Sequence, residues 1–280
     1  MKPPFAYYGG KTGMAPRIVD LIPKHRVYIE PYFGSGAVFF AKPPSRFEIV
    51  NDLDHALVAF YRMLREDLDE LERVCALTPH ARAEFDGADL DGRPDDLELA
   101  RRFWVRVNQS FAKTAGTHTG WSITTARTQS VPASIRGRLG RFADVAERLA
   151  GVSIECCDGP DLVRRLATSD TVVYADPPYL HSTRSHRAGR GGATIDYRVD
   201  AATDEHHERL AEVLVATPAQ VVLSGYASPL YEALYAGWER IDIPVRVHSS
   251  NAVTHERGQR VECLYLNFDP EGALTLEGLG

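Results

Sequence analysis

The sequence predicts an α/β protein in which an open sheet has helices on both faces and a smaller, mainly helical segment is inserted in the middle of the chain. Three observations predict this fold. Short apolar, β-branched stretches alternate with stretches of helical apolar spacing, in residues 1–66 and again after residue 150. A glycine turn joins one of the strands to the helix after it. The alternation breaks over residues 67–150, where we expect helices but no strand.

The composition is that of an ordinary globular protein. Its 280 residues are 44% hydrophobic and 25% charged, which is enough to bury a full core. No stretch is long and apolar enough to span a membrane, and the first residues do not resemble a signal peptide, so we expect a cytoplasmic protein without a membrane partner. The four cysteines show no CxxC spacing, and we expect reduced thiols and no metal.

The net charge of −6 hides a division of charge along the chain. Residues 66–98 contain twelve acidic residues against three arginines. Residues 99–143 contain eight basic residues and no acid. Such a run is often only a solvated face. A polyanion that approaches the protein, however, responds to the charge of the nearby surface more than to the net charge of the whole protein. The basic run therefore favours nucleic acid as a partner.

The first elements surround two glycine turns. Tyr7-Tyr8-Gly9-Gly10-Lys11 precedes a helical stripe at 18–22, so Lys11 would lie at the start of a helix, although a solvated surface lysine would give the same pattern. A strand at 27–30 runs into Pro31-Tyr32-Phe33-Gly34-Ser35-Gly36 and then into an apolar helix start. A strand, a Gly-x-Gly turn and a helix start are typical of a nucleotide-cofactor site, because glycines let the backbone approach the ligand.

A second strand, 46–51, ends at Asp52, twenty-two residues after Glu30. That spacing suits an acid that accepts the hydroxyls of a ribose. Asp52 could instead cap the helix that follows. The glycine turn and the acid together favour a cofactor that carries a nucleoside.

The inserted segment is expected to hold helices at 97–107 and 134–149, with a polar, glycine- and threonine-rich stretch at 108–130 between them. Cations, amides and aromatic rings in that stretch resemble a surface that contacts phosphates and base edges. The alternative is an ordinary insertion whose aromatic residues form a small core of their own. The candidate DNA-binding residues here are Arg106, Asn108, Lys113, Trp121, Arg127, Arg136 and Arg138.

After residue 150 the alternation resumes. Strands are expected at 152–156, 171–175, 220–226, 240–245 and 261–268, and helices at 161–167 and 203–217. Thr203 is expected to cap the second of these helices, and the adjacent His206 and His207 are expected on its solvated face rather than around a metal.

The strand at 171–175 leads directly into Asp176-Pro177-Pro178-Tyr179. The two prolines end the strand because they cannot donate to a sheet ladder. A carboxylate is thus held on a stiff backbone at the carboxyl end of a strand, where ligands bind in open α/β sheets. Asp176 could also be only a turn residue. The basic, glycine-rich stretch 180–192 is expected to be a lid, and it adds Arg184, Arg187 and Arg190 as candidate DNA contacts.

Three motifs now stand in order: YYGGK at 7–11, EPYFGSG at 30–36 and DPPY at 176–179, with Asp52 between the last two. This set resembles the Dam-type adenine-specific DNA methyltransferases, strongly over residues 5–65 and 171–268. The resemblance implies a Rossmann-like class I methyltransferase sheet built from residues 1–66 and 151–270, a target-recognition lobe at 67–150 and a tail at 271–280.

The resemblance also implies ligands and roles. S-adenosylmethionine would be the methyl donor, leaving S-adenosylhomocysteine, without a metal. Double-stranded DNA would be the partner of a prokaryotic or phage enzyme that is a monomer or weak dimer, and a cognate restriction endonuclease could accompany it. The implied cofactor-binding residues are Tyr7, Lys11, Glu30, Phe33, Gly34, Gly36, Asp52 and Asp176. The implied catalytic residues are Asp176, Pro177, Pro178 and Tyr179.

Methyl transfer to an amino group requires residues of these types. The amino group of adenine is a poor nucleophile because its lone pair is delocalised into the ring. A carboxylate at Asp176 and the carbonyl of Pro177 could accept both amino hydrogens and favour the geometry of direct displacement. The base must leave the duplex, and Tyr179 offers it a stacking face. Three alternatives stay open: methylation of cytosine N4 or of RNA, methylation of a protein or small-molecule amide, and an inert DNA-binding relative.

Overall fold

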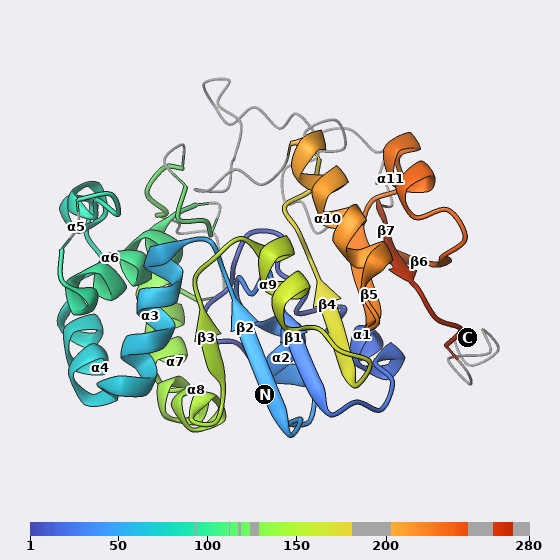
Figure 1. The fold of residues 1–280 in the computed structure, drawn as a ribbon. Coiled ribbons are helices and arrows are strands. Elements are labelled where there is room, and N and C mark those ends of the chain that lie inside the picture. Colours follow the sequence, from blue (N-terminus) through green and yellow to red (C-terminus); the bar gives the residue numbers. More distant parts are fainter. Residues whose placement is uncertain are drawn as a thin grey trace, which may run out of the picture.

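The computed structural model describes residues 1–92, 94–111, 113–116, 119–123, 129–180, 203–245 and 260–270. Within these ranges the strands form a seven-stranded sheet of order β3-β2-β1-β4-β5-β7-β6 (Figure 1). The strands are β1 (Val27–Glu30), β2 (Phe47–Asn51), β3 (Ser153–Glu155), β4 (Thr171–Ala175), β5 (Gln220–Gly225), β6 (Glu239–Val245) and β7 (Arg260–Leu266). β1 to β5 are parallel, whereas β7 runs antiparallel to both β5 and β6. The predicted α/β fold is confirmed.

The order of the strands reverses beside β1. Strand β1 pairs with β2 on one side, where Val27 lies opposite Phe47. It pairs with β4 on the other side, where Val27 lies opposite Thr171. Such a switch point leaves a crevice outside the carboxyl ends of the strands. Glu30, Asp52 and Asp176 all lie at this edge because each ends or directly follows one of these three strands.

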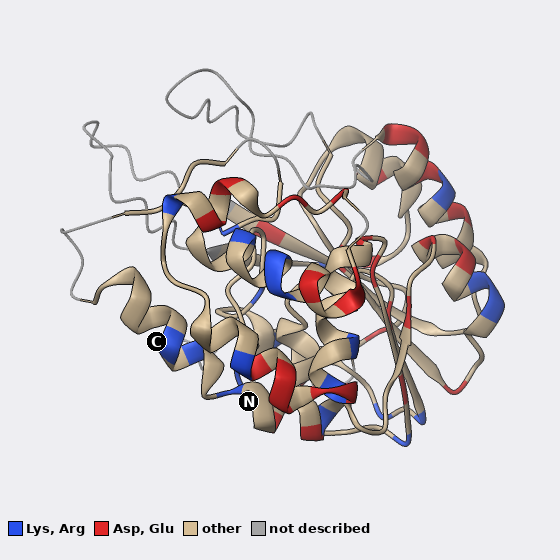
Figure 2. Ribbon diagram, turned by 90° about the vertical axis from the view of Figure 1, so that its left-hand side faces the viewer, with Lys and Arg blue, Asp and Glu red and all other residues tan. Residues whose placement is uncertain are grey.

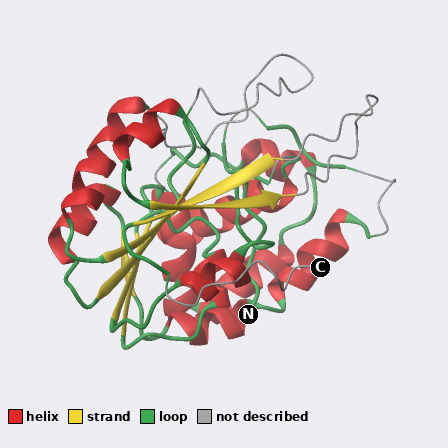
Figure 3. Cartoon of the chain, turned by 90° about the vertical axis from the view of Figure 1, so that its right-hand side faces the viewer, coloured by secondary structure: helices red, strands yellow, loops and turns green. Residues whose placement is uncertain are grey.

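Helices cover both faces of the sheet, as Figure 3 shows. Alternate strand residues point to opposite faces, so Tyr28 joins one hydrophobic core and Ile29 the other. On the Tyr28 face lie α1 (Ala15–Leu21), α2 (Ala37–Ala41) and α3 (His55–Glu66). On the Ile29 face lie α9 (Gly159–Leu166), α10 (Asp204–Ala216) and α11 (Pro229–Leu234). Thr203 caps α10 as predicted, by accepting a hydrogen bond from the amide of His206.

Residues 67–150 are mainly helical, as expected, and gather beside α3 (Figure 1). Their helices are α4 (Leu68–Leu77), α5 (Arg82–Gly87), α6 (Asp96–Gln109), α7 (Val131–Leu139) and α8 (Phe142–Leu149). The single helix expected over 134–149 is wrong, because the chain turns at Gly140 and Arg141 between α7 and α8.

The largest aromatic side chains of this segment pack into the core of the sheet domain. The ring of Trp104 lies parallel to that of Phe60, with centroids 5.9 Å apart and an interplanar angle of 4°, and Phe142 meets Phe60 edge-on at 5.6 Å. A small separate cluster of Phe85, Ala88 and Val105 lies beneath the Trp121 ring. The division of the chain into a catalytic domain and a recognition lobe stays a prediction. Among the helices in the described ranges, none has the length and apolar character needed to cross a bilayer.

Candidate active site

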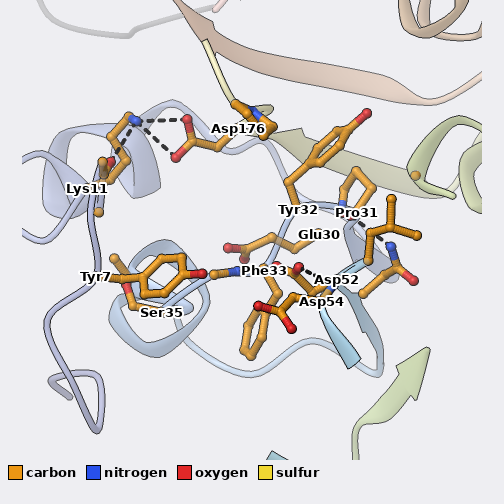
Figure 4. Close-up of a pocket in the computed structure, with 18 of the residues that line it drawn as sticks. Tyr7, Lys11, Glu30, Pro31, Tyr32, Phe33, Ser35, Asp52, Asp54 and Asp176 are labelled. Atoms are coloured by element: carbon orange, nitrogen blue, oxygen red, sulfur yellow. Dashed lines mark hydrogen bonds and ion pairs between the residues drawn. The ribbon is translucent and has the colours of Figure 1, made fainter. Parts of the chain in front are cut away.

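A cleft opens at the carboxyl ends of β1, β2 and β4 (Figure 4). Seven of the eight predicted cofactor-binding residues line it: Tyr7, Lys11, Glu30, Phe33, Gly34, Asp52 and Asp176. They come from the loop before α1 and from the ends of three neighbouring strands. The fold therefore brings together residues that are up to 169 positions apart in the sequence, from Tyr7 to Asp176.

The turn after β1 needs its two glycines. Gly34 has φ 48° and Gly36 has φ 66°, a left-handed conformation that other residues rarely adopt. A Cβ atom at Gly36 would lie 2.6 Å from the Phe33 ring, and one at Gly34 would lie 3.4 Å from the Tyr7 ring. The turn thus brings bare backbone to the wall of the cleft, where a ligand can approach closely.

Asp52 holds this turn from the end of β2. Its carboxylate accepts hydrogen bonds from the amides of Gly34 at 2.9 Å and Asp54 at 3.0 Å. The alternative that Asp52 caps the next helix is wrong, because Asp54 caps α3 by accepting from Ala56. Burial raises the pKa of Asp52 to about 6, and the amides that it accepts from oppose part of this rise.

Glu30 lies at the floor of the cleft and is almost fully buried. The Tyr28 hydroxyl donates to it at 2.7 Å. Burial raises the pKa of Glu30 to about 8, with that hydrogen bond acting against the rise. Glu30 is therefore largely protonated at neutral pH, and a cationic ligand in the cleft would favour its ionised form.

The carboxylate of Asp176 is paired with the ammonium group of Lys11. The Nζ of Lys11 donates to both carboxylate oxygens of Asp176, at 2.7 and 2.9 Å, and to the carbonyl of Gly9 at 3.1 Å (Figure 4). It also donates to the Tyr179 hydroxyl, and it lies 3.3 Å from Glu262 on β7. Lys11 does not lie in the helix as the glycine motif suggested, because α1 begins only at Ala15.

Opposing effects set the charges of this pair. Burial raises the pKa of Asp176 to about 6, Lys11 lowers it and Glu262 raises it. Burial alone would lower the pKa of Lys11, but the carboxylates of Asp176 and Glu262 outweigh it and hold that pKa above its ordinary value. At neutral pH the site therefore holds an ionised Asp176 beside a charged Lys11.

Sequence reasoning missed several residues of the site. The adjacent histidines were expected on a solvated helix face, and this is wrong. His206 lines the cleft and its Nε2 lies 2.8 Å from the Tyr32 hydroxyl, while the fully buried His207 contacts the carbonyl of Pro178 at 3.0 Å. His207 thereby supports the second proline of the Asp-Pro-Pro turn. Nothing in the helical pattern distinguishes these two histidines from solvated ones.

Two of the predicted DNA-binding residues, Lys113 and Trp121, lie at the base of a short hairpin after α6. Ser110 and Trp121 make an isolated antiparallel bridge, with Phe111 donating to the Gly120 carbonyl at 2.8 Å. The Nζ of Lys113 donates to the carbonyl of Asn108 at 2.8 Å. These contacts fix the loop onto the end of α6.

Two side chains expected to contact DNA are used inside the protein. Asn108 is fully buried: its amide donates to the Trp104 carbonyl and its oxygen accepts from Arg138 at 2.7 Å. The structure therefore contradicts a direct DNA contact of Asn108. Arg106 is half-buried over the Phe85 ring.

The remaining candidates divide into exposed and undescribed residues. Arg136 on α7 is exposed, and Trp121 is half-buried, stacked on His80 with centroids 4.8 Å apart. Phe111 and Ile123 beside the bridge are 66% and 67% exposed. Arg127, Arg184, Arg187 and Arg190, and the lid expected over 180–192 beyond Leu180, lie outside the described residues.

In the folded protein, acidic residues neutralise part of the basic run at 99–143. Arg101 pairs with Glu84 and Glu98, and Arg102 also pairs with Glu98, so acids of the preceding segment neutralise two of its cations. Figure 2, which views this side of the molecule, shows Lys and Arg interspersed with Asp and Glu on the helices. The basic residues after α6 therefore matter more for a polyanion than those within it.

The open α/β sheet thus brings a glycine turn, a strand-end acid and the Asp-Pro-Pro-Tyr turn to one crevice, as the methyltransferase resemblance predicts. Comparison with known proteins agrees. Residues 7–95 match the family model of the D12 class N6 adenine-specific DNA methyltransferases. The resemblance that the three motifs predict is thereby confirmed: residues 7–95 match this class, and the chain as a whole is similar to type II methyltransferases.

Two relatives are similar to this chain. The type II methyltransferase M1.LlaDCHI of Lactococcus lactis subsp. cremoris is 25% identical over 96% of this chain and 96% of its own length. The type II methyltransferase M.MjaIII of Methanocaldococcus jannaschii is 30% identical over 40% of this chain and 39% of its own length. The solved structure of precorrin 8W decarboxylase from Methanobacterium thermoautotrophicum covers 96% of this chain and 100% of its own at 8% identity and a TM-score of 0.40, a likeness too low to bear on function.

Proposed function

We propose that the protein transfers a methyl group from S-adenosylmethionine to the N6 amino group of adenine in double-stranded DNA, by direct displacement on a flipped-out base. The observation that carries this proposal is the position of Asp176. Its carboxylate is held in the lining of a cleft whose other walls include a glycine turn and a strand-end acid. A hydrogen-bond acceptor for an amino group thus stands beside a site that fits a nucleoside cofactor.

The cleft suits S-adenosylmethionine, which supplies a methyl group on a cationic sulfur. Gly34 keeps a side chain away from the wall, so the cofactor can lie against the backbone, and Gly36 lets the turn pack against the buried rings of Phe33 and Phe40. Asp52 would accept the ribose hydroxyls, for which its carboxylate must be ionised. The rings of Tyr7 and Phe33 would contact the rest of the cofactor, and Glu30 would face its positive charge.

The Asp-Pro-Pro-Tyr turn suits the target base. The Asp176 carboxylate and the Pro177 carbonyl would accept the two amino hydrogens and direct the nitrogen lone pair toward the methyl group. His207 holds the carbonyl of Pro178 at 3.0 Å, which keeps the turn rigid. The ring of Tyr179, 4.5 Å from that of Tyr226 between centroids, would stack on the extruded base. After transfer, the proton lost from the amino group passes to the Asp176 carboxylate.

One assay tests this function. The protein is incubated with duplex DNA and methyl-labelled S-adenosylmethionine, and the digested nucleosides are separated. We expect the label in N6-methyladenine. A duplex with purine in place of adenine, which lacks only the 6-amino group, is the matched control and should stay unlabelled. Label in N4-methylcytosine, in RNA alone or in protein would refute the proposal, as would no transfer to any DNA.

The DNA would approach the hairpin that carries Phe111 and Ile123 and the basic residues after it. Exposed apolar side chains on a polar loop are suited to enter between bases, while cations nearby hold phosphates. Arg136 is the best test of the cations because it is exposed, whereas Arg138 supports Asn108 from inside the fold.

We expect Arg136→Glu to weaken duplex binding roughly three- to tenfold and to lower the slope of log affinity against log salt by about one. Arg17→Glu, an equally exposed arginine on α1, should change neither quantity. Fluorescence anisotropy over a series of salt concentrations measures both. An unchanged slope for Arg136→Glu would remove α7 from the DNA-binding surface.

A further inference from the structure

We infer that Glu262 on β7 is a positioning residue for methyl transfer: it holds Lys11 and Tyr179 so that Asp176 can release Lys11 and accept the amino group of the base. This inference rests on the proposed function and extends it to a residue outside all three sequence motifs. Glu262 is 4% exposed on a strand whose neighbouring residues are mainly apolar. A carboxylate in such a place is costly unless it is paired.

The partners of Glu262 come from three separate parts of the site. Its Oε1 accepts hydrogen bonds from the Tyr179 hydroxyl and from Ser224 on β5, the latter at 3.1 Å, and lies 3.3 Å from the Nζ of Lys11. Tyr179 in turn accepts from Lys11. Glu262, Tyr179 and Lys11 thus all contact one another, and Lys11 links this set to Asp176.

In this geometry the ammonium group of Lys11 lies within ion-pair distance of two carboxylates, those of Asp176 and Glu262. Lys11 donates to both oxygens of Asp176, at 2.7 and 2.9 Å, so an amino group of the base competes with it for this carboxylate. With Glu262 in reach, Lys11 keeps an ion pair and its contact with Gly9 when the base displaces it from Asp176. Without the charge of Glu262, Lys11 would bind Asp176 more tightly and compete with the base. Glu262 also fixes the hydroxyl of Tyr179, and with it the ring that faces the base.

The charge of Glu262 acts on Asp176 in a way that a titration can detect. Both carboxylates lie within 3.3 Å of one nitrogen atom, so they repel each other. The titratable groups that act on Asp176, from all the elements around it, are Lys11, Glu30, Tyr174, Tyr179, Tyr231 and Glu262. Wild-type transfer should fall as the pH drops through about 6, because protonated Asp176 no longer accepts from the base.

The test is Glu262→Gln, which keeps the shape of the side chain and removes its charge. We expect the plateau kcat to fall roughly tenfold, with the affinity for S-adenosylmethionine unchanged. We also expect the acidic limb of the kcat profile to move down by roughly one pH unit, because Asp176 loses a repelling neighbour. Glu239→Gln, an exposed acid on the adjacent β6, should leave rate and profile unchanged.

A purely structural role for Glu262 would lower kcat through instability and leave the acidic limb in place, and this result would overturn the inference. So would a variant that behaves as wild type. If Glu262→Gln does not fold, Ser224→Ala replaces it, because loss of that hydroxyl loosens Glu262 without changing its charge. We then expect a smaller fall in kcat, and wild-type kcat in that variant would overturn the inference. Absence of transfer by the wild-type protein would instead refute the proposed function.

Discussion

Replacing Asp176 by alanine should lower kcat for methyl transfer by at least about 10³-fold and leave S-adenosylmethionine binding within a few-fold of wild type. In the proposed reaction this carboxylate would face the reacting amino group and act mainly in the transition state, where the nitrogen lone pair is localised and positive charge develops. The cofactor, by contrast, would rest on the glycine turn and Asp52. Single-turnover kinetics with a cognate duplex and titration with S-adenosylhomocysteine measure the two effects separately.

The structure explains why this variant should fold. Lys11 loses Asp176 but keeps Glu262 at 3.3 Å and the carbonyl of Gly9 at 3.1 Å, so its buried charge is still compensated. Asp170→Ala is the matched control, since Asp170 is exposed and directly precedes the same strand at its other end. A variant at position 176 that retains a kcat within tenfold of wild type would remove Asp176 from its proposed role.

Replacing Gly36 by alanine should weaken cofactor binding at least about 100-fold. The left-handed φ of 66° costs an alanine roughly 1–2 kcal/mol. Its Cβ would also lie 2.6 Å from the ring of Phe33 and 2.8 Å from that of Phe40, and both rings are buried in the core. Overpacking of this kind costs roughly 1–3 kcal/mol. The turn can avoid the clash only by moving the backbone that lines the cleft.

Isothermal titration with S-adenosylhomocysteine measures this loss, and circular dichroism checks that the variant is folded. Gly151→Ala is the matched control: Gly151 is exposed and a Cβ there would meet no heavy atom within 4 Å. Cofactor affinity within threefold of wild type for Gly36→Ala would show that the turn does not hold the cofactor closely, and the proposed location of the cofactor would have to change.

Local patterns in the sequence were enough to predict most of the sheet. β1 and β4 lie at the predicted residues, because short β-branched stretches bounded by polar residues, glycine or proline favour strands. The glycine turn and the strand-end acids were also predictable, since the carboxyl ends of parallel strands meet at one edge. The helices α4 and α5 were missed, because α5 is only six residues long and α4 buries only Leu71 and Cys75, so both show narrow apolar stripes.

The sequence by itself determined the fold class, the glycine turn at Gly34 and Gly36 and the place of Asp176 at the end of a strand, because each depends on neighbouring residues in the chain. Only the tertiary structure decided which partners these residues have. Lys11 meets Asp176 across 165 residues and Tyr179 meets Glu262 across 83. No periodicity encodes such contacts: they arise when strand order and helix packing bring distant segments to one crevice, where burial makes each charge depend on the charges around it.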